Sequence, residues 1–238
     1  MAADQWAQTV RRQLALGRLL PLGGAADGAW ITESAAVGVL RRATHAALPA
    51  VRLNAVRIAL TKAASPPAVP PPPSALPPGP LRIEAECATT ADVPFPETAA
   101  RLRAVLGRAA AERIGLRVEA IDLRLTELLD DRPSRDGRDD TATAPPPPQP
   151  PPPAGQGRDP LTRAALSVRG VSRATLRTRG GDHVQGDHVQ TDIAVTAERR
   201  ALDVARDVRT AVTGASAQVV APPSTVSVMV TTIESPPI

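Results

Sequence analysis

Aromatic side chains are almost absent from this chain of 238 residues, which has two Trp, one Phe and no Tyr. A hydrophobic core must therefore be built from Val, Leu, Ile and Ala. Because Ala in particular buries little apolar area, we expect modest stability. The scarcity of aromatic rings also argues against binding of single-stranded nucleic acid, which relies on stacking of bases on such rings.

Cysteine and lysine are nearly missing as well. A single cysteine, Cys87, excludes an internal disulfide and fits a reducing compartment. Only Lys62 is a lysine among the 28 basic residues, and the net charge is +4. Ala, Arg, Pro, Gly and Val have GC-rich codons, so this usage indicates a high-GC bacterium such as an actinobacterium. Nucleic-acid binding through arginines stays an alternative function, although the charges are mixed in sign along the chain rather than clustered.

Long apolar runs are also lacking. No stretch of about 18 apolar residues predicts a transmembrane helix. The N-terminus does not have the basic segment and apolar segment of a secretory signal. We therefore expect a cytoplasmic protein, with any membrane contact made peripherally on the inner face of the plasma membrane.

The first 27 residues predict an amphipathic helix followed by a turn. Trp6, Val10 and Leu14 share one face, which Leu20 continues, while arginines lie elsewhere. A basic amphipathic helix with an interfacial Trp can lie on an anionic membrane. The alternative is that this helix packs on the rest of the protein. The candidate membrane or partner surface consists of Trp6, Val10, Arg11, Arg12, Leu14 and Arg18.

Proline is abundant, with 27 residues that concentrate in two tracts. The first tract is "SPPAVPPPPSALPPGP" at 65–80, and the second is "APPPPQPPPPAGQG" at 144–157. Proline lacks an N–H and fixes φ, so both tracts predict extended polyproline II segments. The first is expected to be a loop insertion. The second, with the charged residues before it, predicts a disordered linker over 132–159.

One order of elements occurs twice, and each copy runs helix, strand, strand, helix, strand. In the first copy, at 28–131, the helix that follows Thr32 or Ser34 leads into strands at 51–60 and 81–90. A second helix then runs from Pro96 to Gly115, and a strand follows with an expected bulge near Ala120. The second copy lies at 160–234, and its long helix is expected to end at Gly214. The predicted fold class is α+β, with two modules that each consist of a three-stranded sheet packed with helices.

Two segments resemble one protein family. "PETAARLRAVLGRAAAERIGLRVEAIDLRLTEL" (96–128) and "RGVSRATLR" (169–177) are similar to parts of the alkaline-shock or general-stress proteins of Gram-positive bacteria, also called the envelope stress response family. The resemblance implies a cytoplasmic, self-associating protein without enzymatic activity that supports cell-envelope homeostasis. Actinobacterial relatives are also expected to carry a nucleopolyhedrovirus fibrous-body family label. We interpret such a label as a match to the proline-rich, basic composition, since no sustained heptad predicts a viral-type coiled coil.

The repeat "GDHVQGDHVQ" at 181–190 brings His183 and His188 beside Asp182 and Asp187. Such a group could hold zinc if the loop brought its side chains together. The simpler interpretation is a duplicated segment in a surface loop that tolerates insertions. Cys87 is expected on a core face, and His45 near the end of a helix, where the helix dipole favours a cation. Motifs of nucleotide-binding enzymes, zinc proteases and serine hydrolases are absent. We therefore expect a non-enzymatic scaffold with no cofactor or metal, and with protein partners.

Overall fold

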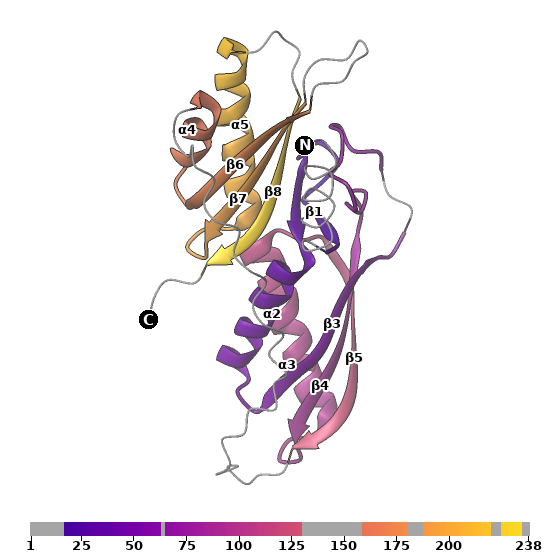
Figure 1. The fold of residues 1–238 in the computed structure, drawn as a ribbon. Helices are drawn as coiled ribbons and strands as arrows, with labels where there is room; N and C mark the ends of the chain where they lie inside the picture. The colour runs from indigo at the N-terminus through magenta and orange to yellow at the C-terminus, as the bar shows by residue number, and fades with distance from the viewer. Residues whose placement is uncertain (1–16, 63–64, 130–158, 180–187, 220–224, 235–238) are drawn as a thin grey trace, which may run out of the picture.

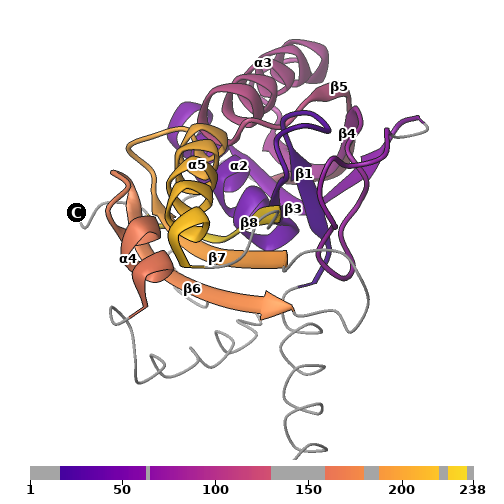
Figure 2. The same ribbon diagram turned by 90° about the horizontal axis from the view of Figure 1, so that it is seen from above.

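The fold is α+β and contains two β-sheets with helices packed against them (Figures 1 and 2). The computed structural model describes residues 17–62, 65–129, 159–179, 188–219 and 225–234. The N-terminal half contains β1 (Leu19–Leu22), β2 (Ala29–Thr32), α2 (Glu33–Ala47), β3 (Val51–Leu60), β4 (Leu81–Thr90), α3 (Phe95–Arg108), the π-helical segment η1 (Ala109–Ile114) and β5 (Val118–Leu129). The C-terminal half contains α4 (Pro160–Leu166), β6 (Val171–Arg179), β7 (His188–Thr196), α5 (Ala201–Val219) and β8 (Thr225–Glu234).

The first helix–strand–strand–helix–strand unit forms the three-stranded sheet, in the order β3-β4-β5. β3 and β4 are antiparallel, whereas β4 and β5 are parallel. The predicted alternation of β4 is confirmed, because Leu81, Ile83, Ala85 and Cys87 are buried. Thr32 is the N-cap of α2, and its Oγ1 accepts the Ala35 N–H at 3.3 Å. The expected irregularity in β5 is present as a register shift between Val118 and Ala120.

The second unit has the same order and the same strand directions. β6 and β7 are antiparallel, and β7 and β8 are parallel. Gly170 has a φ of 95° at the turn into β6, which only glycine adopts readily. The buried face of β7 is the predicted one and consists of Val189, Thr191, Ile193 and Val195. The prediction that Gly214 ends the long helix is wrong, because α5 continues to Val219.

The second sheet has five strands, two more than predicted. β1 and β2 form an antiparallel pair, and β2 pairs in parallel with β8, giving the order β1-β2-β8-β7-β6. Leu20 therefore belongs to a strand and not to an amphipathic helix, and Trp30 and Ile31, which precede the cap of α2, belong to a second strand that was not predicted. Both short strands are buried at every position, so they lack the polar–apolar alternation that identifies a half-buried strand.

The two sheets share one hydrophobic core. It contains Leu40, Ile83 and Leu102 from the first unit and Ile193 and Val208 from the second. Gly115, at the end of η1 in the first unit, lies directly against α5 of the second unit. Its φ is 101°, and a Cβ there would lie 2.4 Å from the Cβ of Leu202 in α5. Glycine is thus required both for its backbone conformation and for this close approach.

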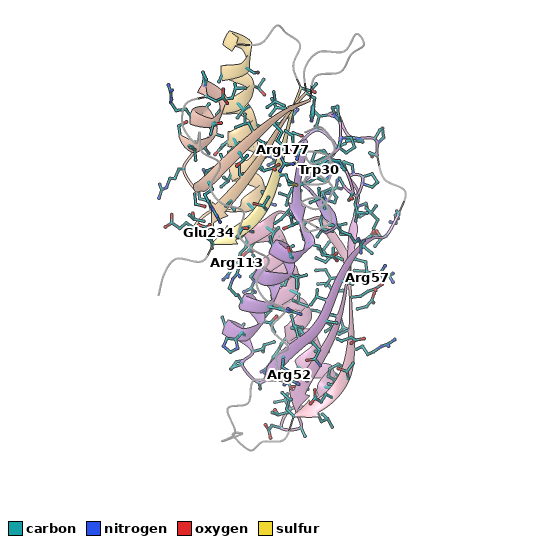
Figure 3. All side chains as sticks on the ribbon, viewed as in Figure 1. Trp30, Arg52, Arg57, Arg113, Arg177 and Glu234 are labelled. Atoms are coloured by element: carbon teal, nitrogen blue, oxygen red, sulfur yellow. The ribbon has the colours of Figure 1, made fainter. Side chains whose placement is uncertain are left out.

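The first proline tract packs against the five-stranded sheet. Val69 is 5% exposed and forms a small apolar cluster with Leu19, Trp30 and Met229. Trp30, which is labelled in Figure 3, donates its Nε1–H to the carbonyl of Leu76 at 3.1 Å. The tract is therefore an insertion in the β3–β4 connection, as predicted, but it covers apolar surface of the other sheet.

Candidate functional site

A hollow of about 320 Å³ lies between the β1–β2 turn and α5. It is lined by Asp27 of the turn and by Arg206, Arg209, Thr210 and Thr213 of α5. Asp27 is more than 170 positions from the four residues of α5, and the pairing of β2 with β8 brings the turn and the helix together. The hollow therefore lies where the two halves of the chain meet.

Glycines shape the turn that carries Asp27. Gly23 and Gly28 have φ values of 71° and 57°. A Cβ on Gly23 would lie 2.1 Å from Oδ2 of Asp27, so a larger residue would displace the carboxylate. The Gly24 N–H donates to the same oxygen at 2.7 Å. The turn thus fixes the orientation of the carboxylate that faces α5.

Arg206 binds this carboxylate with two nitrogens. Its Nε donates to Oδ1 of Asp27 at 2.8 Å, and its Nη2 donates to Oδ2 at 3.2 Å. Partial burial acts to raise the pKa of Asp27, but hydrogen bonds from Arg206 and Gly24 and the positive charges of Arg206 and Arg209 lower it overall. The hydrogen bond to Asp27 raises the pKa of Arg206. Arg209 donates to the carbonyl of Ala26. We interpret the hollow as a structural joint, since its charged groups bind the protein itself.

His188, the second histidine of the repeated pentapeptide, is the first residue of β7. Its Nδ1 lies 2.8 Å from Oγ1 of Thr225, and its Nε2 lies 2.9 Å from Oγ of Ser227. Both ring nitrogens thus face hydroxyl groups of β8, an arrangement typical of a structural histidine. Among the described residues, no group of three or more His, Cys, Asp or Glu side chains is placed to hold a metal ion. Asp182, His183 and Asp187 lie outside the described residues.

A polar network lies beside His188 on the same strand. Arg177 of β6 contacts Asp192 of β7, with Nη2 and Oδ2 3.1 Å apart, and Gln190 donates to Oδ1 of Asp192 at 2.9 Å. The side chain of Asp192 is only 10% exposed, so its charge is held in a largely dry position by arginine and amide groups. The network ties β6 to β7 across their polar face.

β5 is an edge strand, and no described strand pairs with its outer side. Its helix-facing side chains, Ile121 and Leu123, are only half-buried at the margin of the core. Near its end, Leu128 is 61% exposed, the largest value among the apolar side chains that stand out from the described surface. Exposed edges of this kind offer unpaired backbone groups to another strand.

At the opposite edge of the same sheet, α2 side chains bind two backbone groups of β3. Glu33 accepts the N–H of Ile58 in β3 at 2.9 Å, and Arg41 donates to the carbonyl of Asn54 at 3.0 Å. At the β5 edge, Arg103 of α3 donates to the carbonyl of Ile121 at 3.2 Å. α2 thus protects β3 with both a donor and an acceptor, whereas α3 contributes a single exposed arginine to β5.

The predicted membrane or partner surface falls mostly outside the described residues, which do not include Trp6, Val10, Arg11, Arg12 and Leu14. Arg18 is described, and its Nη1 lies 3.8 Å from Oε2 of Glu33 at the start of α2. Cys87 is on the core face, as predicted. Burial raises the pKa of its thiol, which donates to the carbonyl of Arg124 at 3.6 Å.

Sequence reasoning identified β5 as a strand but missed its position at an open edge. The alternation of Ile121, Leu123 and Leu125 signals one buried face, and it carries no information on which strands lie alongside. No family model matches the chain, and no curated protein matches it either. The function is therefore inferred from the residues of this chain and from the resemblance of its segments.

Proposed function

We propose that this protein is a non-enzymatic scaffold or adaptor that supports cell-envelope stress homeostasis through protein–protein contacts at or near the membrane. The observation that carries the proposal is the open edge of β5, with Ile121 and Leu123 half-buried beside it. Strand addition at such an edge supplies affinity through main-chain hydrogen bonds and specificity through alternate side chains.

The repeated order of elements supports a modular scaffold. We propose that the two units are modules connected by the proline-rich segment 132–159, which links them while they pack on one shared core. In the second unit, the edge of β8 that corresponds to the open edge of β5 is occupied by β2. One unit therefore supplies the internal joint, and the other offers its edge to a partner.

The envelope part of the proposal comes from the resemblance of segments 96–128 and 169–177 to the envelope stress response family. None of the described helices is long and apolar enough to cross a membrane. Peripheral contact would instead involve residues 1–16, with Trp6 and Val10 as apolar and Arg11 and Arg12 as basic contributors.

Nucleic-acid binding has weaker support. A binding surface for nucleic acid needs arginines that are free to neutralise phosphates, which releases the counterions condensed on the nucleic acid. Several arginines are instead paired with carboxylates, for example Arg52 with Glu127 at 2.6 Å and Arg173 with Glu234 at 2.8 Å. The two partners of each pair offset each other's charge. The charged side chains on the surface of the three-stranded sheet are of both signs and do not form a basic stripe.

Fractionation of native cells tests the proposal. We expect the full-length protein to sediment with membranes and to be released by a salt wash. A variant without residues 2–16, which leaves β1 intact, should stay in the soluble fraction. The matched control is a deletion of equal length in the linker, residues 138–152, which should behave as the full-length protein.

A deletion strain extends the test to function. The strain should tolerate alkaline or cell-wall stress less well than its parent, and the full-length gene should restore growth. Normal stress tolerance of the deletion strain, together with a protein that stays soluble in full-length form, would contradict the envelope role.

A further inference from the structure

We propose that two copies of this protein pair through β5, antiparallel, about a two-fold axis at Leu123, so that their three-stranded sheets join into one. The proposal rests on the scaffold role proposed above and names the partner, a second copy of the chain. The three-stranded sheet has the order β3-β4-β5, so β5 lies at its margin (Figure 1). Among the described residues, no strand pairs with its outer side.

The backbone of β5 presents its hydrogen-bonding groups in the required directions. The carbonyl of Arg124 points toward β4, where it accepts from the thiol of Cys87. The carbonyl of Ile121 is reached by Arg103 of α3 instead. Successive residues of a strand alternate in the side to which their N–H and C=O point. Since the register is regular from Ala120 to Leu125, the amide groups of Ile121, Leu123 and Leu125 point outward.

With Leu123 on the two-fold axis, these outward residues face one another in hydrogen-bonded pairs. Leu123 faces Leu123 of the second copy, and Ile121 faces Leu125. All three side chains lie on the helix-facing side, where Ile121 and Leu123 are half-buried. Apolar cross-strand pairs stabilise a sheet, and here they would also extend the core across the junction. The exposed hydrogen bond from Arg103 to Ile121 would be exchanged for one from the N–H of Leu125.

The same register matches the charges on the other face. Asp122 of one copy faces Arg124 of the second, and the symmetry repeats this pair once. Within one copy, Asp122 already contacts Arg82, with Nη1 and Oδ2 3.3 Å apart, and both side chains are about half exposed. Arg124 lies beside Glu86 in the register of β4 and β5. A shift of one residue would place apolar against charged side chains, so this register is favoured over its neighbours.

In the second unit, the edge that corresponds to the outer edge of β5 is already paired with a strand. β8 is the third strand of the second unit, as β5 is of the first, and β8 accepts β2 along this side at Val228, Met229 and Val230. The repeated topology thus offers two equivalent edges, one filled by a strand of the same chain and one available to a second chain. The β3 edge is a poorer choice, because Glu33 and Arg41 already bind two of its backbone groups, the N–H of Ile58 and the carbonyl of Asn54.

A charge-swap series measured by sedimentation equilibrium tests the pairing. Asp122→Arg places two arginines opposite each other, and Arg124→Asp places two aspartates opposite each other. Each single change should weaken dimerisation by about tenfold, whereas the double variant should recover to within about threefold of the wild type. Arg57→Asp is the matched control, because it makes the same charge change on β3, opposite Glu84 of β4, and should leave the dimer unchanged.

Leu123→Pro gives a second test that does not depend on charge. Proline removes the N–H at the two-fold axis, but that N–H points away from β4, so an edge strand tolerates it. The variant should be monomeric with an unchanged circular dichroism spectrum. A monomeric wild type at high concentration would overturn the proposal, as would a dimer that survives each of the single changes Asp122→Arg, Arg124→Asp and Leu123→Pro. If the wild type is monomeric but complements the deletion strain, the pairing fails and the scaffold role stands. If the wild type is a dimer and the deletion strain has no envelope defect, the pairing stands and the proposed envelope role fails.

Discussion

At the scale of single residues, Asp27 shows how one carboxylate fixes two distant parts of the chain. It accepts the Gly24 N–H within its own turn and two hydrogen bonds from Arg206 on α5. Neither contact was predicted from the sequence. An aspartate between glycines is typical of a turn, but the arginine that it binds lies 179 residues away, and the pairing depends on the path of β2 beside β8.

Asp27→Asn should lower the free energy of unfolding by about 1 kcal/mol at pH 7, since Arg206 is half exposed and solvent screens the pair. The folded-state pKa of Asp27 lies below its ordinary value of 3.8. The stabilisation is therefore complete above the unfolded-state pKa and is lost as the pH falls through the folded-state pKa. Urea unfolding at pH 7 and at about pH 3 should give a difference between wild type and variant that shrinks with acidity.

Asp207→Asn is the control for this comparison. Asp207 also contacts an arginine, Arg199, at 2.8 Å, but its side chain is 51% exposed. The change should cost less than about 0.5 kcal/mol at either pH. Equal effects of the two substitutions would show that the Asp27 contact is an ordinary surface pair and not a joint.

At the scale of elements, the sequence predicted the longer strands and helices because each has a face with a regular period. β4 and β7 alternate, and α2 and α5 place apolar residues along one side. β1 and β2 have four residues each and are buried throughout, so they offer no period to detect. Their identity as strands depends on β8, which follows them by almost 200 residues.

The first proline tract, at 65–80, also shows that local sequence does not predict which parts of the fold a segment contacts. Its composition predicts an extended conformation, and it says nothing about the surface on which the segment lies. Trp30 and Met229 lie on the side of the five-stranded sheet that the tract covers, and the hydrogen bond from Trp30 to Leu76 fixes it there. The tract thus acts as part of the core and not as a spacer.

Val69→Ala tests this role of the tract. Val69 is 5% exposed, so removal of its methyl groups should lower the free energy of unfolding by about 1–2 kcal/mol. Val93→Ala is the matched control, because Val93 is 36% exposed and should lose less than about 0.5 kcal/mol. In a Trp6→Phe background, the emission of Trp30 reports the loosening of the cluster directly. Indistinguishable stabilities of the two alanine variants would mean that the tract contributes no packing.

At the scale of the whole molecule, the repeat was visible in the sequence, but the way in which its two copies combine was not. β2 belongs to the sheet of the second unit, although it directly precedes the first helix of the first. Thr32 donates to the carbonyl of Thr231, and Arg42 donates to that of Ile233. These contacts cross between the units, so the halves share backbone pairing as well as apolar core.

This sharing predicts a single cooperative unfolding transition. Hydrogen exchange of β4 and of β7 should report free energies of opening within about 1 kcal/mol of each other, because neither sheet can open without exposing the common core. Val212→Ala, a change in α5 of the second unit, should lower the protection of β4 in the first unit by as much as that of β7, about 2 kcal/mol. The reciprocal change, Leu102→Ala in α3, should lower the protection of β7. If β4 keeps its protection when β7 loses it, the units are independent modules, and the contacts of β2, Thr32 and Arg42 with β8 contribute little to cooperativity.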